Sequence, residues 1–119
     1  MDTRPKTIIC DIDGTLVKHQ LPWKNTSSSQ KLELLPGTIE KFSEWDAKGY
    51  NIILMTGRKE SLRVNTEKQL SDIGVFYDKL IMGVGGGPRI IINDNKPDGR
   101  KTAFAHSLER NKGISNLDI

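Results

Sequence analysis

Two carboxylates stand one residue apart where the first apolar run of the chain ends, in the segment IICDIDGTLV of residues 8–17. Side chains at i and i+2 of a strand point to the same side, so Asp11 and Asp13 can act together. Carboxylates this close repel each other unless a cation lies between them. Asp94, after a later apolar run, adds a third acidic group. A few oxygen ligands that leave room for water and phosphate suit Mg²⁺.

A carboxylate can also attack phosphorus and form an aspartyl phosphate, while a neighbouring carboxyl group protonates the leaving oxygen and later activates water. Thr56, Gly57 and Arg58 follow the second apolar run. A hydroxyl, a backbone amide and a cation in this place would hold a transferring phosphoryl group. For Arg58 a pair with acids of the following helix is the alternative. A lone Asp-x-Asp is more often a turn or a helix cap, but the three segments together favour phosphoryl transfer.

Strands and helices are predicted to alternate along the chain. Ile39, Phe42 and Trp45 recur every three residues, as in a helix, and short β-branched runs predict buried parallel strands. The predicted strands are 7–12, 50–56, 79–82 and 89–94, the predicted helices are 38–48 and 60–73, and segment 102–108 fits either. Such units form an open parallel sheet with helices on both faces, and its ligands bind outside the carboxyl ends of the strands.

Length and charge limit the classes of protein to consider. A chain of 119 residues suits one compact domain over 1–119. The net charge of +3 comes from cations scattered among acids, which is typical of a solvated surface. We expect no membrane span and no signal peptide. The single cysteine, Cys10, cannot form an internal disulfide, which favours a cytoplasmic location. Cys10 lies in an apolar run and is expected to be a small core residue.

The three segments together resemble the motifs of the haloacid dehalogenase (HAD) superfamily of phosphohydrolases. DIDGT at 11–15 matches its first motif, IILMTGR at 52–58 its second, and IIINDNKPD at 90–98 its acidic fourth motif. The resemblance implies a Rossmann-like three-layer α/β/α fold. Its parallel sheet would have strand order 5-4-1-2-3, with segment 102–108 as the fifth strand.

The same resemblance assigns roles to individual residues. Asp11 would be the nucleophile and a Mg²⁺ ligand, and Asp13 the general acid/base, with its backbone carbonyl on the metal. Thr56 would bind phosphate, and Asp94 would be the remaining protein ligand of the metal. Asp98 fits either a second acid of the fourth motif or a surface acid in a turn.

The third motif of the superfamily, a lysine that pairs with the nucleophile and phosphate, has no match here. The segment before the predicted fourth strand, 82–88, contains no lysine. We expect Lys96 or Arg89 to supply the charge, because both flank that strand, with Lys79 as a further option. The glycine-rich part of this segment lacks the Lys-Ser/Thr of a phosphate loop and is predicted to be a connector or the rim of the site. His19 and His106 have no partners at metal-ligand spacing and are interpreted as structural or surface residues.

Neither gap where HAD enzymes carry a cap domain is long enough to hold one. Residues 14–35 and 83–88 provide 22 and six positions, against at least roughly 50 for an independent domain. A flap from Leu16 to Gln30 is the most that fits, and Trp23 is expected either to line it or to pack against the core or a neighbouring subunit. The site would therefore be open, or closed by another subunit in a homo-oligomer.

Capless members of the superfamily include phosphatases of sugar phosphates in surface-polysaccharide synthesis and the phosphatase domains of polynucleotide kinases. The lack of a basic stripe with interleaved aromatic residues argues against nucleic acid. We therefore expect a small sugar phosphate, with a nucleic-acid 3′-phosphate as the alternative.

Two other classes of protein share some of these features. A signalling receiver domain carries its acceptor aspartate on the third strand, whereas the predicted strand 79–82 is followed by GVGGG, which rejects that class. A degenerate HAD domain that binds Mg²⁺ and phosphate without turnover remains as the second rival, because of the missing lysine.

Overall fold

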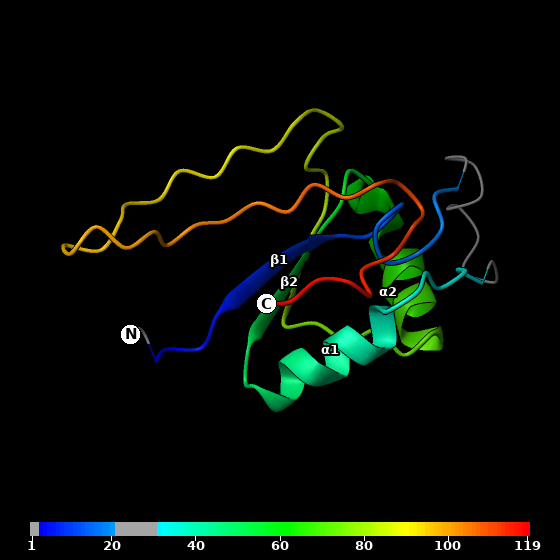
Figure 1. Ribbon diagram of the computed structural model, residues 1–119. Coiled ribbons are helices and arrows are strands. Elements are labelled where there is room, and N and C mark those ends of the chain that lie inside the picture. The colour runs from blue at the N-terminus through cyan, green and yellow to red at the C-terminus, as the bar shows by residue number, and fades with distance from the viewer. Residues whose placement is uncertain (1–2, 21–30) are drawn as a thin grey trace.

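The computed structural model describes residues 3–20 and 31–119. Three parallel strands form one sheet in the order β1-β2-β3, with β1 at Thr7–Asp11, β2 at Asn51–Met55 and β3 at Lys79–Ile81 (Figure 1). The first three predicted strands and the parallel α/β class are thereby confirmed. Residues 21–30 of the predicted flap, which include Trp23, lie outside the described residues.

The two predicted helices are also confirmed. Helix α1 spans Thr38–Ala47, and a short 3₁₀ turn, η2 at Glu60–Leu62, leads into helix α2 at Arg63–Asp72. The side chains of Phe42 and Trp45, three residues apart on α1, are almost fully buried and lie 5.4 Å apart between ring centroids. No helix in the described parts of the chain has the length and apolar composition needed to cross a membrane.

The helices pack on one face of the sheet. Ile52 and Leu54 of β2 are buried in the same apolar cluster as side chains of α1 and α2. Successive strand residues face opposite sides, and on the other side Ile9 of β1 and Ile81 of β3 are 45% and 49% exposed. Within the described residues the sheet therefore has one helical layer, where the sequence predicted one on each face.

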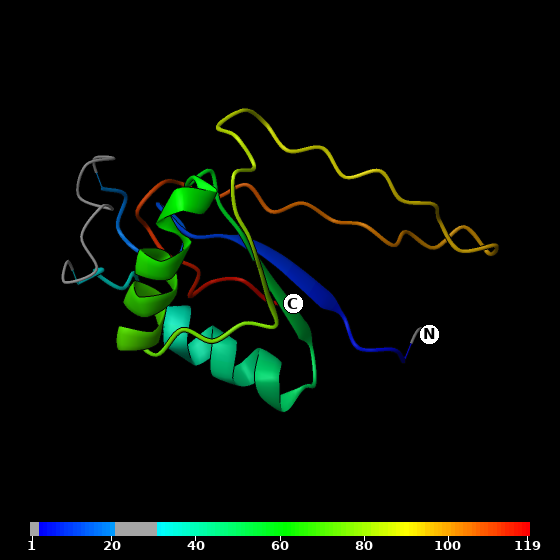
Figure 2. The ribbon, with the colours of Figure 1, turned by 180° about the vertical axis from the view of Figure 1, so that it is seen from behind.

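The predicted fourth and fifth strands do not form in this structure, and this part of the prediction is wrong for the single chain. Residues 89–108 instead make an extended arm, with an outgoing limb at 89–95 and a returning limb at 100–108 (Figures 1 and 2). A turn joins the limbs, in which the Lys96 amide donates to the Arg100 carbonyl at 2.9 Å.

The length of one connection explains the difference. Only residues 82–88 separate the end of β3 from Arg89. A strand parallel to β1 must begin at the opposite end of the sheet, which requires a crossover of a dozen or more residues. The chain therefore cannot readily place 89–94 beside its own β1, and the radius of gyration of 15.0 Å exceeds the value of about 13.5 Å for a compact domain of this length.

Beyond the arm the chain returns to the body and completes the core. Ile114 is buried, and its amide donates to the carbonyl of Pro36 at 2.9 Å. Gly113 adopts φ 85°, and a Cβ there would lie 2.3 Å from the Pro36 oxygen. This close approach fixes the segment against the start of α1.

We expect Gly113→Ala to lower the free energy of unfolding by at least about 2 kcal/mol, because strain at positive φ and a clash with backbone act together. Gly49→Ala is the matched control, since Gly49 has φ 74° and no atom within 4 Å of the added Cβ. Its cost should be only about 1 kcal/mol. Urea unfolding measures the free energy of unfolding of both variants. If both lose the same amount, the contact with Pro36 does not contribute to stability.

Candidate active site

The paired carboxylates lie where β1 ends and the chain turns back. Asp11 is the last residue of β1, and the next residue, Ile12, is fully buried and anchors the turn. The Leu16 amide donates to the Ile12 carbonyl at 2.9 Å, and Gly14 adopts φ 87°. Glycine takes this conformation without strain. The turn therefore holds Asp11 and Asp13 at the carboxyl edge of the sheet.

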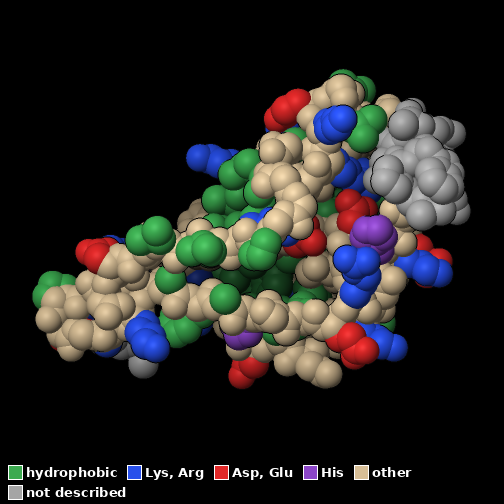
Figure 3. Space-filling model, turned by 90° about the horizontal axis from the view of Figure 1, so that it is seen from above, with side chains coloured by type: hydrophobic (Ala, Val, Ile, Leu, Met, Phe, Trp, Pro, Cys, Tyr) green, Lys and Arg blue, Asp and Glu red, His purple; other side chains and the backbone are tan. Residues whose placement is uncertain are grey.

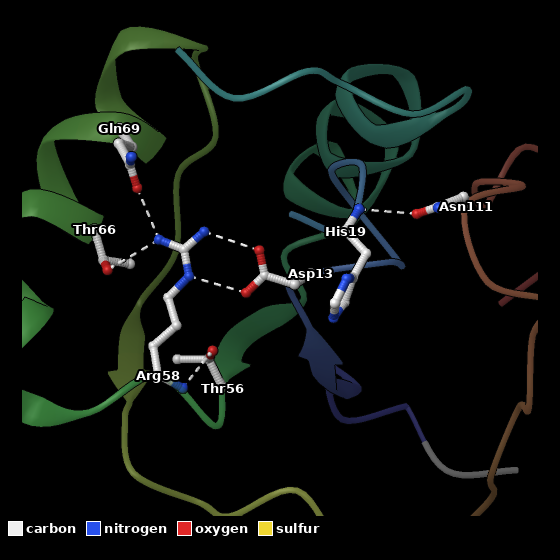
Figure 4. Close-up of polar contacts among 7 residues, drawn as sticks. All are labelled: Asp13, His19, Thr56, Arg58, Thr66, Gln69 and Asn111. Carbon is white, nitrogen blue, oxygen red and sulfur yellow. Dashed lines mark hydrogen bonds and ion pairs between the residues drawn. The ribbon is translucent and has the colours of Figure 1, made fainter. Parts of the chain in front are cut away.

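Asp13 is held by a bidentate ion pair with Arg58 (Figure 4). The Nε and Nη2 groups of Arg58 donate to the two Asp13 oxygens at 2.9 and 2.8 Å. Its Nη1 group donates to Thr66 Oγ1 at 3.1 Å and to Gln69 Oε1 at 2.7 Å, both on α2. The Arg58 side chain is 3% exposed. All three nitrogens of the guanidinium are engaged, so Arg58 faces Asp13 and α2.

Thr56 and Gly57 form the second loop of the site. Thr56 is buried, and its Oγ1 accepts a hydrogen bond from the Arg58 amide at 3.1 Å. The glycine-rich segment packs on this loop, since the Gly83 amide donates to the Arg58 carbonyl at 2.7 Å and the Val84 amide to the Thr56 carbonyl at 3.0 Å. The segment thus serves as a connector and also borders the second loop.

The carboxyl group of Asp11 lies in an environment that disfavours its charge. Burial raises its pKa above 3.8, and the neighbouring Asp13 carboxylate acts in the same direction. The Ile12 amide, the Arg89 guanidinium and His19 partly oppose this rise. Arg89 Nη1 lies 3.9 Å from Asp11 Oδ1. A second cation at this point would stabilise the Asp11 carboxylate further.

Asp94 and Lys96 are not brought to this site by their own chain. Both lie in the outer part of the arm, where the Asp94 carbonyl accepts a hydrogen bond from Thr102 Oγ1. Asp98 pairs with Arg100 at 2.8 Å in the same turn, and Lys79 begins β3, at the opposite end of the sheet. Across residues 3–20 and 31–119 no three His, Cys, Asp or Glu side chains gather in a way that would hold a metal ion.

Several residues of the site were not foreseen from the sequence. Thr66 and Gln69 accept hydrogen bonds from the Arg58 guanidinium. These two polar residues stand three apart on a helix with few apolar residues, and that spacing is the sequence signal that would have indicated them. The backbone amide of Asn111 donates to the Gly14 carbonyl at 2.8 Å. The side-chain Oδ1 of Asn111 accepts from the backbone amide of His19 at 2.9 Å. Asn111 has φ 64°, a conformation that asparagine tolerates.

Cys10, next to Asp11, is expected to react slowly with thiol reagents in the folded protein. Burial raises the pKa of its thiol to about 12, and its Sγ donates to the Asp11 carbonyl at 3.3 Å. Only the thiolate is reactive. At pH 8 the folded protein should be modified roughly 10³-fold more slowly than the protein in urea. Equal rates in the two conditions would mean that Cys10 is freely ionised in the fold.

Residues 5–89 match the family model of the polynucleotide kinase PNKP phosphatase domain, which is more than half of the chain. The matched stretch contains both loops of the site and ends at Arg89, where the arm begins. No curated protein gave a match.

Solved structures show the same fold. One similar structure is a chain of a Pnkp1/Rnl/Hen1 complex, which is 29% identical with a TM-score of 0.58 over 72% of the present chain. Another is a chain of the Pnkp1/Rnl/Hen1 RNA repair complex, which is 31% identical with a TM-score of 0.55 over 66% of the present chain. The present chain spans only 30% and 25% of those two chains. A target protein from Vibrio cholerae is similar over 74% of this chain and 79% of its own, at 20% identity and a TM-score of 0.53, which bears on the fold alone.

Proposed function

Because the chain belongs to the family of polynucleotide kinase PNKP phosphatase domains, within the HAD superfamily, we propose that it is a Mg²⁺-dependent phosphomonoester hydrolase with an aspartyl-phosphate intermediate. The observation that carries the proposal is the pairing at the end of β1. We assign Asp11, which is half-buried with the Arg89 guanidinium 3.9 Å away, as the nucleophile, and Asp13, two residues on, is oriented by a buried arginine.

The reaction divides between the two carboxylates. An oxygen of Asp11 attacks phosphorus, the ester P–O bond breaks, and the leaving oxygen takes the bonding electrons and a proton from Asp13. A water molecule then gives its proton to Asp13 and attacks phosphorus, which releases phosphate and restores Asp11. Each Asp13 oxygen has a second lone pair, so the ion pair with Arg58 leaves a position for the proton.

Three further residues support this chemistry. Thr56 Oγ1 accepts from the Arg58 amide, which leaves its hydroxyl proton to donate to a phosphate oxygen, with the Gly57 amide beside it. Arg89, 3.9 Å from Asp11, takes the place of the third-motif lysine, and we assign Lys96 no role at the site of its own chain.

The chemistry of the donor set fits Mg²⁺ in part. The Asp11 carboxylate and the Asp13 backbone carbonyl would hold the ion, which prefers oxygen ligands. The Asp94 carboxylate is the third ligand that the sequence predicts, but it lies on the arm and does not join these two in the single chain. When bound, it would neutralise charge on the transferring phosphoryl group. Burial and the neighbouring Asp13 carboxylate raise the pKa of Asp11, and a bound cation would act against both effects.

Two substrate classes each have an observation in their favour. Ion pairs join some of the described cations to acids, such as Lys68 with Asp72 and Arg63 with Glu60, so these cations are partly neutralised and contribute less to attracting a polyanion. This favours the small sugar phosphate expected from the sequence. The family match and the RNA repair complex favour a 3′-phosphate on a nucleic acid instead.

Release of phosphate from sugar phosphates, nucleotides and 3′-phosphorylated oligonucleotides, with and without Mg²⁺, tests the proposal. We expect turnover that requires the metal, with one class hydrolysed far faster than the others. Bound Mg²⁺ without turnover on any substrate would reject the hydrolase and favour the degenerate binding domain.

A further inference from the structure

The arm of residues 89–108 carries apolar side chains that have no place to pack on their own chain. Ile90 is 84% exposed, Ile92 94% and Phe104 72%. In Figure 3, hydrophobic side chains gather along the arm and on the floor of the hollow beside it. Such an exposed β-branched segment is a template for pairing with another chain.

The body of the molecule lacks the partner that this segment would supply. β1 is an edge strand, paired with β2 alone in the described sheet. Ile9 of β1 and Ile81 of β3 are half-exposed on the face without helices. The open edge of β1 is the position where the sequence predicted the fourth strand.

We propose that two copies of this chain exchange arms, so that the outgoing limb of each pairs with β1 of the other and delivers its Asp94 to that copy's Asp11 and Asp13. The short connection through residues 82–88 favours a second copy over the chain's own β1, as described above. Exchange of an identical element is a direct route to a closed dimer. The delivery of Asp94 to a metal-binding site rests on the proposed function.

The direction of the arm supports this pairing. The outgoing limb begins at Arg89, whose side chain lies 3.9 Å from Asp11. From there the limb runs antiparallel to β1 (Figures 1 and 2). A twofold axis perpendicular to β1 reverses the second copy. The second copy's limb then runs parallel to β1 of the first, and its Asp94 end lies toward the carboxyl end of that strand. Arg89 stays beside Asp11 of its own chain, and each site becomes composite.

Cross-linking tests the exchange without reference to activity. One chain carries Ile9→Cys and the other Ile92→Cys, both with Cys10→Ser, and the two are unfolded together and refolded. A short bifunctional thiol reagent should give a covalent species of twice the 13.3 kDa of one chain. Val64→Cys, exposed on α2, replaces Ile9→Cys in the control and should give little of that species. Cross-linking at the control level would overturn the exchange.

Complementation tests the composite site. Asp11→Asn and Asp94→Asn should each be inactive alone, and random pairing of the two should restore about one quarter of native turnover, since half the dimers then contain one whole site. If the native protein is active and the mixture is not, delivery of Asp94 between copies is wrong. If the native protein itself has no turnover, the proposed function fails, and cross-linking still decides the exchange.

Discussion

Asp11→Asn is expected to reduce phosphate release by at least about 10³-fold, as loss of a nucleophile does in other covalent catalysts. The amide has nearly the shape of the carboxylate but cannot form the aspartyl phosphate. Steady-state release of phosphate at saturating substrate and Mg²⁺ measures the effect. Asp46→Asn, at the exposed end of α1 far from the carboxyl edge of the sheet, is the control and should keep native turnover.

The same variant should be no less stable than the native protein. The pKa of Asp11 is raised in the fold, so ionisation favours the unfolded chain as the pH rises through that pKa, and asparagine removes this cost. In metal-free buffer at pH 7 the free energy of unfolding of Asp11→Asn should equal or exceed that of the native protein. The difference should shrink toward pH 4, where the carboxyl group becomes neutral. A large loss of stability at pH 7 would indicate a structural role instead.

Arg58→Met is expected to lower the free energy of unfolding by about 3–5 kcal/mol, because it leaves a partly buried carboxylate without its cation. Thr66 and Gln69 lose the same donor. Turnover should also fall by roughly 10²-fold, since Asp13 is no longer held in position. Chemical unfolding and phosphate release measure the two effects on one preparation.

Lys68→Met is the matched control for this change. Lys68 also pairs with a carboxylate, Asp72 at 3.0 Å, but both side chains are about half-exposed on α2. Its loss should cost no more than about 0.5 kcal/mol. Adding Asp13→Asn to Arg58→Met should recover part of the stability, because the unpaired charge is removed. If the double variant is as unstable as the sum of the single ones, the ion pair is not the cause.

Local patterns predicted the elements that local forces determine. The runs at 7–12 and 50–56 became β1 and β2, and the three-residue spacing of Phe42 and Trp45 became the buried stripe of α1. The segment IIIND has the same β-branched character, yet it forms no strand here. Pairing of a strand depends on whether its connection can reach the sheet, and the composition of the run does not contain that information.

The site divides in a similar way. The sequence predicted that Asp11, Asp13 and Thr56 lie together because polar residues follow the ends of parallel strands, where such sheets bind ligands, and the structure places them at the ends of β1 and β2. The partners of Arg58 were not foreseen, because a guanidinium on a loop can face phosphate, solvent or another element. The orientation of the Arg58 side chain depends on α2, because Thr66 and Gln69 on that helix accept its hydrogen bonds.

The hydrogen bonds that join Asn111 to Gly14 and His19 can form only late in translation. The ribosome makes the loop that carries Asp13 long before it makes Asn111, and the whole arm is synthesised between them. Until residues 111–114 emerge and pack against Pro36 and Gly14, a nascent chain holds the first loop without these bonds. A truncated protein that stops at residue 89, where the family match stops, would retain both loops of the candidate site but lack the C-terminal segment that is hydrogen-bonded to one of them.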